Sequence, residues 1–329
     1  MLLIMSKHFF SIIIPVKEIN DYIRESIPKI LELENQDFEI IILPNEDNVP
    51  FTAAKTQIVP SGKVWPAQKR NMWAEICKWD ILCFLDDDAY PNTDWLTNVI
   101  KYFDDETVVA VGWPWITPDD DDFWAKVSGA VFLTPLGWAN PDRYLPLGKA
   151  KQVKDWASVN LFVRKQDFLK IWGFDNDYWP GEDTKLCLDL IKQTNKKIMY
   201  APDVIVHHHR RPWLMKHIKQ VGNYGLHRGH FFLKWDFRIV YLVPTLFVLF
   251  IVFWWILSMI FWWIILDLYL LGIIVYLLSL IVSFLDISIK IKKISIAFFS
   301  IFYIFLTHVA YGIMFLKWLF TPNLKSKLR

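Results

Sequence analysis

Three consecutive carboxylates stand at the end of an apolar, strand-like run: residues 81–85 lead directly into Asp86, Asp87 and Asp88. Adjacent anions repel one another, so this position is best explained by a divalent cation or a ligand that neutralises them. Because side chains alternate along an extended chain, Asp86 and Asp88 are expected to share one face while Asp87 turns away. The alternative is a solvated acidic turn that caps the helix from about Thr93. The apolar run and the motifs below favour the cation or ligand site.

A second acidic pair, Glu182 and Asp183, follows the turn Trp179-Pro180-Gly181 at the start of a helix with many apolar residues. The helix dipole stabilises a carboxylate there, so a capping acid is one interpretation. Two acids behind such a turn, in a chain that already holds an acidic metal-like site, favour a general base instead. The aspartates at 119–122 have no apolar strand before them and indicate a solvated loop or helix start.

Alternating strands and helices surround the first acidic run. Apolar runs predict buried strands over 9–16 and 38–44, a short strand over 57–59, and helices over 21–33 and 67–78. This order is a doubly wound α/β pattern, and such sheets bind ligands at the carboxyl ends of their strands. Both Asn45-Glu46-Asp47 and the run 86–88 follow strands and therefore lie at that edge.

The same alternation continues toward three histidines. We expect a helix over 94–103, strands over 108–112 and 158–164, a helix over 166–171 and a final strand over 198–206. The last strand runs into His207-His208-His209. Together these elements predict one catalytic domain over residues 1–206.

The composition changes sharply after about Trp235. Charged and apolar residues alternate up to that point, whereas Ile239 to Phe320 is almost entirely apolar and aromatic. The formal net charge of +2 is too small to indicate a nucleic acid, and the basic residues gather near the apolar segments, where membrane lipids are the expected anionic partner. The 3 cysteines fit no metal or disulfide spacing, which indicates reduced residues in a cytosolic compartment.

The apolar part predicts a membrane anchor. Residues 207–238 mix aromatic and basic side chains, as helices in the headgroup region do. About three transmembrane helices are expected within 239–320: over 239–266, 268–285 and 294–318, with breaks at Asp267 and Asp286.

The positive-inside rule gives the expected orientation. Two crossings before Lys290, Lys292 and Lys293 put these lysines on the side of the amino-terminal domain, which indicates the cytoplasmic face of a multi-pass membrane protein. The opening residues lack the features of a signal peptide, in agreement with this orientation. The basic tail over 321–329 does not obey the rule after three crossings.

Several motifs resemble, in order, the inverting nucleotide-sugar glycosyltransferases of family 2, whose catalytic domain has the GT-A fold. The donor half is similar in Ile12-Ile13-Ile14-Pro15-Val16, in Pro66-Ala67-Gln68-Lys69-Arg70-Asn71 and in Phe84-Leu85-Asp86-Asp87-Asp88-Ala89. The acceptor half is similar in Asn160-Leu161-Phe162-Val163-Arg164, Gly173-Phe174-Asp175 and Gly181-Glu182-Asp183. The resemblance covers roughly residues 9–235. It implies an α/β GT-A domain with a Rossmann-like, doubly wound mixed sheet, followed by an α-helical transmembrane region.

For the donor, the resemblance implies a Mg²⁺ or Mn²⁺ ion that stabilises the leaving nucleoside diphosphate. Asp88 would ligate this ion together with Asp86, which would also sit nearer the ribose. Asn45 stands where the family usually has an acid that faces the base, and the donor would be UDP- or GDP-linked. Lys69 and Arg70 either meet the diphosphate or pair with acids. The residues expected around the donor are Pro15, Val16, Glu18, Asn45, Lys69, Arg70, Asp86 and Asp87.

Inversion needs one general base that deprotonates the acceptor hydroxyl. The resemblance assigns this role to Asp183, with Glu182 as the alternate. Gln220, Tyr224 and Arg228 follow the last strand at helical spacing, where processive relatives carry a Gln-x-x-Arg-Trp sequence that holds the acceptor. The different spacing and the few spans favour transfer of a single sugar. The residues expected around the acceptor are Asn160, Trp179, Gln220 and Arg228.

The predicted protein is a membrane-anchored, metal-dependent, inverting glycosyltransferase. Its acceptor would be a lipid-linked or membrane-proximal glycan in envelope polysaccharide assembly. One alternative is a transferase to polyprenyl phosphate, whose acceptor is already an anion and needs no strong base. Another is a non-catalytic nucleotide-sugar-binding assembly subunit, against which the set of Asp86, Asp88 and Asp183 argues.

Overall fold

The computed structural model of the chain forms two compact units. It describes residues 8–46, 50–137, 140–176, 181–234, 239–254, 256–257 and 264–321. The first unit comprises Met1–Ile116 and Leu145–His209, and the second comprises Thr117–Tyr144 and Arg210–Lys325. The expected boundary near residue 206 thus falls close to the later junction, while the segment 117–144 joins the second unit.

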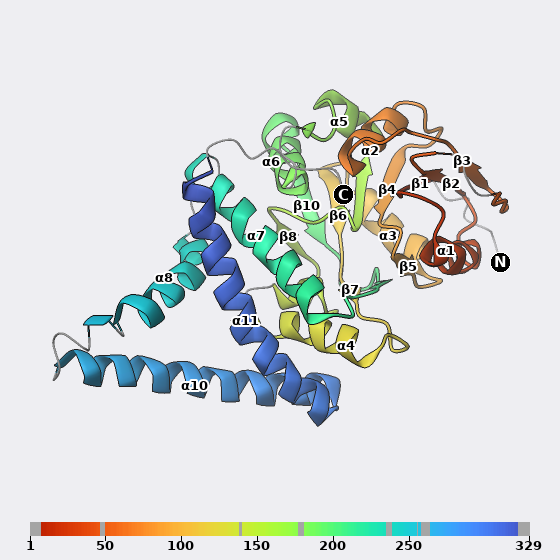
Figure 1. Cartoon of the computed structure of the whole chain (residues 1–329). Coiled ribbons are helices and arrows are strands. Elements are labelled where there is room, and N and C mark those ends of the chain that lie inside the picture. The colour runs from red at the N-terminus through yellow and green to blue at the C-terminus, as the bar shows by residue number, and fades with distance from the viewer. Residues whose placement is uncertain are drawn as a thin grey trace. The chain divides into compact units, whose positions relative to one another are not determined.

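The first unit is built on an eight-stranded mixed sheet (Figure 1). Its strands run in the order β3-β2-β1-β4-β9-β6-β10-β8, and β9 lies antiparallel between β4 and β6. The doubly wound mixed sheet predicted from the sequence is confirmed. The strand bounds are β1 Phe10–Pro15, β2 Phe38–Leu43, β3 Thr56–Ile58, β4 Ile81–Leu85, β6 Val108–Gly112, β8 Lys151–Val153, β9 Asn160–Arg164 and β10 Lys197–Tyr200.

Five helices accompany this sheet, and their local signals explain where they begin. The side chain of Asn20 caps the first of them by accepting a hydrogen bond from the backbone N–H of Ile23 at 2.9 Å. The same helix buries Ile23, Ile27 and Ile30, as its apolar spacing predicts. The helices are α1 Asp21–Leu31, α2 Pro66–Ala74, α3 Trp95–Phe103, α5 Lys165–Lys170 and α6 Glu182–Thr194.

The single strand predicted over 198–206 is wrong, because the chain leaves the large sheet after Tyr200. Pro202 has no N–H to donate to a strand ladder, and a turn carries the chain to a new strand, β11 Val206–His208. This strand pairs with β5 Ala89–Pro91 and β7 Trp115–Ile116 in a second, three-stranded sheet. The small sheet therefore brings the histidines beside the residues that follow β4.

Gly112, at the end of β6, leaves room for the indole ring of Trp156. A Cβ atom on Gly112 would lie 2.2 Å from Cγ of Trp156, whose Nε1 donates to the carbonyl of Trp113 at 3.0 Å.

Gly112→Ala should therefore destabilise the protein by about 1–3 kcal/mol through overpacking. Urea unfolding in detergent measures this change. Gly222→Ala is the control, because its Cβ meets only the flexible side chain of Met314 at 3.2 Å; equal stability of the two variants would contradict the prediction.

The second unit is helical. Its longer helices are α4 Phe123–Ala130, α7 Leu214–Lys234, α8 Val243–Leu249, α10 Ile264–Ile291 and α11 Ile294–Leu319. Single-turn segments are η1 Val131–Leu133, η2 Pro135–Gly137, η3 Pro141–Arg143, η5 Ile239–Leu242 and the π-helical η6 Phe250–Trp254. Figure 1 shows α7 running alongside α11.

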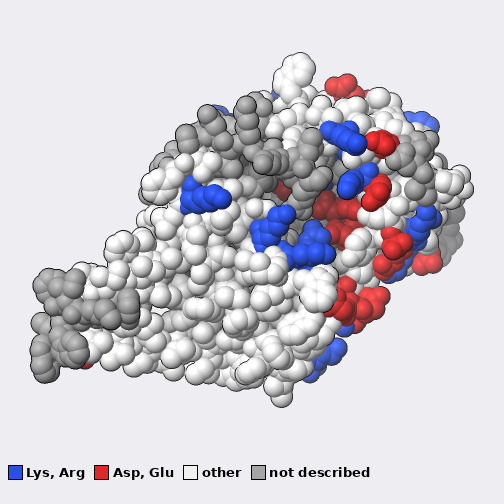
Figure 2. All heavy atoms as spheres, viewed as in Figure 1, with Lys and Arg blue, Asp and Glu red and all other residues white. Residues whose placement is uncertain are grey.

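Two helices among the described residues are long and apolar enough to cross a membrane. They are Leu266–Ile291, with a mean hydropathy of 2.6, and Ile294–Trp318, with a mean hydropathy of 1.8. Only 6% of the most apolar stretch of the first is buried, so it does not have the burial expected of a soluble core helix. Figure 2 shows very few charged side chains over α8, α10 and α11 on the face in view.

The expected spans differ from these helices in their limits. Asp267 and Asp286 both lie inside α10, and Asp286 pairs with Lys290 at 2.7 Å, so the breaks predicted at these acids are wrong. An i,i+4 pair near a helix end holds both charges without interrupting the helix.

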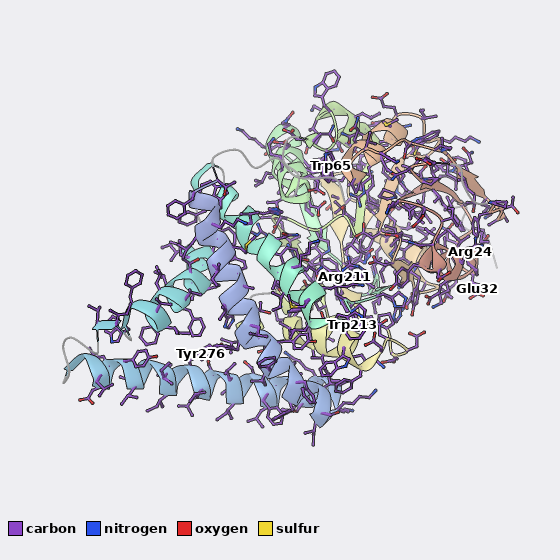
Figure 3. The ribbon with its side chains drawn as sticks, in the orientation of Figure 1. Arg24, Glu32, Trp65, Arg211, Trp213 and Tyr276 are labelled. Atoms are coloured by element: carbon purple, nitrogen blue, oxygen red, sulfur yellow. The ribbon has the colours of Figure 1, made fainter. Side chains whose placement is uncertain are left out.

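Between the two acids of α10, the Tyr276 hydroxyl lies 3.0 Å from Nδ1 of His308 on α11 (Figure 3). The described part of the first predicted span, Ile239–Trp254, is shorter than a crossing, and residues 255 and 258–263 lie outside the described residues.

Candidate active site

The three aspartates after β4 point to three different partners. Asp86 accepts a hydrogen bond from NH2 of Arg70 at 2.8 Å, and Asp88 lies 3.0 Å from Nε2 of His208. Asp87 accepts a hydrogen bond from Asn20 at 2.6 Å. Asp86 and Asp88 face a common cluster with His208, while Asp87 is held by the cap residue of α1. The chain turns at residues 87–88, so this turn, and not the alternation of an extended strand, places the two carboxylates together.

Asp86, Asp88 and His208 can together hold a cation. One ligand atom from each lies within 4.8 Å of the other two. Two carboxylates and an imidazole are a donor set that suits Mn²⁺ and, through its oxygens, Mg²⁺. The residues present therefore fit the metal that the sequence implies.

His208 was not among the ligands expected from the sequence. It faces Asp88 because β11 pairs antiparallel with β5, with His208 opposite Ala89. Neighbouring His207 points to the other face of the small sheet, where it stacks on Tyr90 with the ring centroids 4.9 Å apart. The three consecutive histidines are recognisable in the sequence as possible metal ligands. The alternation of side chains along a strand does not predict which of them turns toward the acids.

Replacing His208 should weaken metal binding. His208→Ala removes one of three ligands, and we expect the affinity for Mn²⁺ to fall by at least about tenfold. Electron paramagnetic resonance of free Mn²⁺ measures this without depending on turnover. His207→Ala is the matched control, since its ring lies on the opposite face; the assignment fails if both variants bind Mn²⁺ as the unchanged protein does.

Arg70 connects the aspartates with the second acidic pair. Its side chain is 3% exposed, and its positive charge acts on Glu182 and on Asp183 as well as pairing with Asp86. The negative charge of Asp86 also acts on Asp183. Glu182 and Asp183 therefore lie near the carboxylates that follow β4, in the same unit.

The pKa values of the second acidic pair are shifted upward. Burial, and then the charge of Asp183, raise the pKa of Glu182 to about 8, although the N–H of Gly181 and the charge of Arg70 oppose the shift. Burial also raises the pKa of Asp183, against the charge of Arg70 and a hydrogen bond from Ser158. A carboxylate with a raised pKa is a stronger proton acceptor, which suits a general base.

Helix α2 also holds the loop that leads toward this pair. The side-chain amide of Asn71 donates to the carbonyl of Phe174 at 2.7 Å and accepts from its N–H at 2.8 Å. Gly173 has a φ of +72° and lies so close that a Cβ would be 2.4 Å from Oδ1 of Asn71. The motif Gly173-Phe174 thus serves to dock the loop. Trp179, expected near the acceptor, lies outside the described residues.

Lys69 holds the ends of β1 and β2 together. Its buried ammonium donates to the carbonyls of Val16 at 2.7 Å and Leu43 at 2.9 Å, and to Oδ1 of Asn45 at 2.7 Å. Burial lowers its pKa to about 8, against the charge of Asp87. These contacts favour a structural role for Lys69 over contact with a diphosphate, and they also position Asn45.

The other residues expected at the donor lie at or next to the end of β1. Pro15 closes the strand, Val16 is buried, and Glu18 is exposed in the turn that follows. Of the two roles left open for Arg70, pairing with an acid is the one observed.

The residues expected at the acceptor separate between the units. Asn160, in the first unit, is fully buried, and its amide donates to the carbonyl of Pro114 at 3.2 Å, which favours a structural role. Gln220 and Arg228 lie on α7 in the second unit. Gln220 donates to the Tyr224 hydroxyl at 3.0 Å, and Arg228 donates to the Tyr241 hydroxyl at 3.2 Å.

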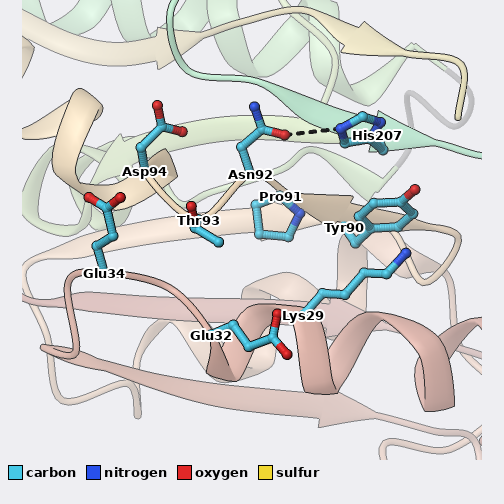
Figure 4. Close-up of a pocket in the computed structure, with 9 residues that line it drawn as sticks. All are labelled: Lys29, Glu32, Glu34, Tyr90, Pro91, Asn92, Thr93, Asp94 and His207. Carbon is cyan, nitrogen blue, oxygen red and sulfur yellow. Dashed lines mark hydrogen bonds between the residues drawn. The ribbon is translucent and has the colours of Figure 1, made fainter. Parts of the chain in front are cut away.

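An open cavity of about 460 Å³ lies on the His207 face of the small sheet (Figure 4). Tyr90 forms part of its wall, with Nζ of Lys29 3.3 Å from the centre of the ring, and His207 bonds Asn92 at 2.9 Å. None of the residues expected at the site lines this cavity. We place the active site at the acids because they combine a possible metal-binding cluster with shifted carboxyl groups.

The chain is similar to known glycosyltransferases. Residues 11–172 match the model of glycosyl transferase family 2. A pre-mycofactocin glycosyltransferase of Mycobacterium tuberculosis is 29% identical over 162 residues, which cover 49% of this chain but only 33% of that protein. The dolichyl N-acetyl-alpha-D-glucosaminyl phosphate 3-beta-D-2,3-diacetamido-2,3-dideoxy-beta-D-glucuronosyltransferase of Methanococcus voltae is 23% identical over 255 residues, covering 72% of this chain and 78% of that protein.

A solved structure shares the fold. It is the mannosyltransferase PcManGT from Pyrobaculum calidifontis in complex with GDP-Man and Mn²⁺, with a TM-score of 0.55 and 14% identity over 96% of this chain and 88% of that one. At this identity the likeness concerns the fold alone.

Proposed function

We propose that this chain, whose residues 11–172 match glycosyl transferase family 2, transfers a sugar from a nucleotide-sugar donor to a lipid-linked or membrane-proximal acceptor, with inversion. The single observation that supports this proposal is that Arg70 interacts with two sets of acids. One set belongs to the possible metal-binding cluster of Asp86, Asp88 and His208, and the other is the pair Glu182 and Asp183 at the start of α6. One group suits the leaving group of the donor, and the other suits the incoming hydroxyl.

The donor half rests on the cluster of Asp86, Asp88 and His208. These residues would hold Mg²⁺ or Mn²⁺, which when bound would offset the negative charge on the departing nucleoside diphosphate. Asp87, held by Asn20, and Asn45, held by Lys69, would contact the nucleoside of a UDP- or GDP-linked donor. PcManGT, named in complex with GDP-Man and Mn²⁺, shows that this fold accommodates such a pair of ligands.

The acceptor half rests on Asp183. Its carboxylate would take the proton of the acceptor hydroxyl as the oxygen forms its bond to the anomeric carbon and the bond to the diphosphate breaks on the opposite face. Burial raises the pKa of Asp183, while the charge of Arg70 and the hydrogen bond from Ser158 oppose this shift and favour the ionised form that accepts the proton. Glu182 is the alternate base.

A membrane-bound acceptor is supported by the second unit and by a relative. Helix α10 is apolar and exposed, as lipid contact requires, and the Methanococcus voltae relative is named for a dolichyl phosphate-linked substrate. We propose that the apolar helices anchor the chain beside a substrate that cannot leave the bilayer. The cytoplasmic orientation of the first unit and the number of spans remain predictions.

The proposal is tested with the purified chain in lipid nanodiscs. A panel of UDP- and GDP-sugars is supplied with Mn²⁺, with and without polyprenyl phosphate-linked glycans, and both released nucleotide and glycosylated lipid are measured. We expect nucleotide release to depend on the lipid acceptor and to match product formation. Donor binding without either product, across the panel, would instead favour the non-catalytic nucleotide-sugar-binding subunit.

A further inference from the structure

Three arginines of the second unit gather around two tyrosines that the function above does not use. The guanidinium carbon of Arg210 lies 4.9 Å from the centre of the Tyr144 ring. The positive charges of Arg143, Arg210 and Arg211 all act on the hydroxyl of Tyr224. Segments that are distant in the sequence, 143–144, 210–211 and α7, therefore form one basic cluster, which we call the arginine cluster.

Arg210 is held firmly in this cluster. It is 8% exposed, its Nε donates to Oγ1 of Thr117 at 3.2 Å, and its backbone N–H donates to Asp121 at 3.1 Å. Gly129 leaves room for this arrangement, since a Cβ there would lie 2.2 Å from Oγ1 of Thr117. A buried guanidinium is costly unless it is fixed by partners, so its position is preorganised and does not depend on a flexible side chain finding a ligand.

The Tyr224 hydroxyl adds a neutral donor. It accepts a hydrogen bond from Nε2 of Gln220 at 3.0 Å, which leaves its own O–H available to donate to an acceptor. Tyr224 as a residue is 43% exposed, and burial around its hydroxyl raises the pKa of this group, so the O–H stays protonated and able to donate. Figure 3 places Arg211 by the first residues of α7, and Figure 2 shows Lys and Arg side chains gathered over this helix.

The helix that carries Tyr224 lies directly against an apolar helix. A Cβ on Gly225 would be 2.3 Å from the carbonyl oxygen of Tyr311 on α11, so the two helices touch through their backbones. Farther along, the rings of Phe232 and Phe315 pack with their centroids 5.8 Å apart. The arginine cluster is therefore fixed to a helix that is apolar enough to cross a membrane.

We propose that the arginine cluster and the Tyr224 hydroxyl bind the phosphate of a lipid-linked acceptor. Guanidinium groups offer paired N–H donors that match phosphate oxygens, and a phenol O–H adds a further hydrogen bond. Because the arginine cluster is attached to α11, a phosphate that belongs to a membrane lipid should bind to it in preference to a free phosphate in solution. This inference rests on the proposed function and narrows its acceptor to a phosphate-bearing lipid, as opposed to a neutral glycolipid.

The test removes charge inside and outside the cluster. Arg143→Gln combined with Arg211→Gln is compared with Lys216→Gln combined with Lys219→Gln, which removes the same charge from exposed positions of α7. Arg210 is left unchanged because it is buried. Binding of the full chain is measured to nanodiscs that contain polyprenyl phosphate, to nanodiscs of equal charge that contain phosphatidylglycerol, and to inorganic phosphate; donor affinity and melting temperature are measured in parallel.

We expect the arginine variant to lose at least about tenfold in affinity for polyprenyl phosphate nanodiscs, with donor affinity and melting temperature unchanged. The lysine variant should change by less than about twofold, as exposed charges do. The proposal would be overturned if both variants lost the same affinity for polyprenyl phosphate nanodiscs, or if the arginine variant lost the same affinity for phosphatidylglycerol nanodiscs. Either result would mean that the arginines act only as general positive surface charge. A loss of donor affinity instead would assign the arginines to the donor diphosphate. Intact binding by the unchanged protein without any transfer would refute the proposed function and leave this site standing.

Discussion

Asp88→Asn should reduce sugar transfer by about 10²- to 10³-fold while the protein remains folded. Asp88 shares the metal-type cluster with Asp86 and His208, and replacing its carboxylate by an amide removes a charged ligand. The stabilisation of a departing diphosphate by a cation amounts to several kcal/mol, and each 1.36 kcal/mol corresponds to about a factor of ten in rate. Steady-state transfer rates at saturating Mn²⁺, together with melting curves, measure the effect.

Asp120→Asn is the matched control for this experiment. Asp120 belongs to the other acidic run, 119–122, and it is exposed in the second unit. The substitution removes one aspartate charge from the chain in the same way, so transfer should stay within about twofold of the unchanged protein. Full activity of Asp88→Asn, or full activity of the unchanged protein after chelation, would rule out the metal role.

Asp183→Asn should lower turnover by about 10²- to 10⁴-fold, the range in which a general base contributes. Asn cannot accept the proton of the acceptor hydroxyl, but it keeps nearly the same size and the hydrogen-bonding capacity toward Ser158. Donor affinity should therefore remain within about threefold. Turnover and the dissociation constant of the donor are measured separately, because a loss in both would indicate a disturbed site and would not identify a base.

The pH profile separates Asp183 from Glu182. Burial raises the pKa of Asp183, and the group acts as a base only when ionised, so turnover should rise with pH above the range in which an ordinary aspartate ionises and then level off. Asp183→Asn should remove this rise. The pKa of Glu182 is about 8, so Glu182→Gln replaces a carboxyl group that is largely protonated below that pH by a neutral amide, and it should leave the rise in place and keep most of the rate. If Glu182→Gln abolishes the rise and Asp183→Asn keeps it, the base is Glu182.

Much of the first unit is readable from the sequence because its strands are buried on both faces. β4 and β6 are uninterrupted apolar runs, β1 and β2 are interrupted only by Ser11 and Glu39, and the acids directly after β4 mark the carboxyl edge of the sheet. By contrast β5, β7 and β8 are two or three residues long. Such short strands are defined by the partners they find and not by their own periodicity, so local patterns could not predict them.

The same limit applies to the site. Asp86, Asp88 and Asp183 could be selected because carboxylates next to strand and helix ends carry a recognisable signal. The place of His208 depends on the pairing of β11 with β5, which joins residues more than a hundred positions apart. For Lys69 the sequence offered a diphosphate or an acid as partner, whereas the main partners are backbone carbonyls, which leave no mark in a sequence.

The central claim, that the acids around Arg70 form the donor site of a glycosyltransferase, is tested most directly by anomalous diffraction from crystals grown with Mn²⁺ and a nucleoside diphosphate. The account predicts one strong manganese peak bound by Asp88, with Asp86 and His208 as its neighbours, and the diphosphate on the same ion. A manganese peak away from these residues, or a nucleotide seated in the cavity beside Tyr90 and His207, would contradict it.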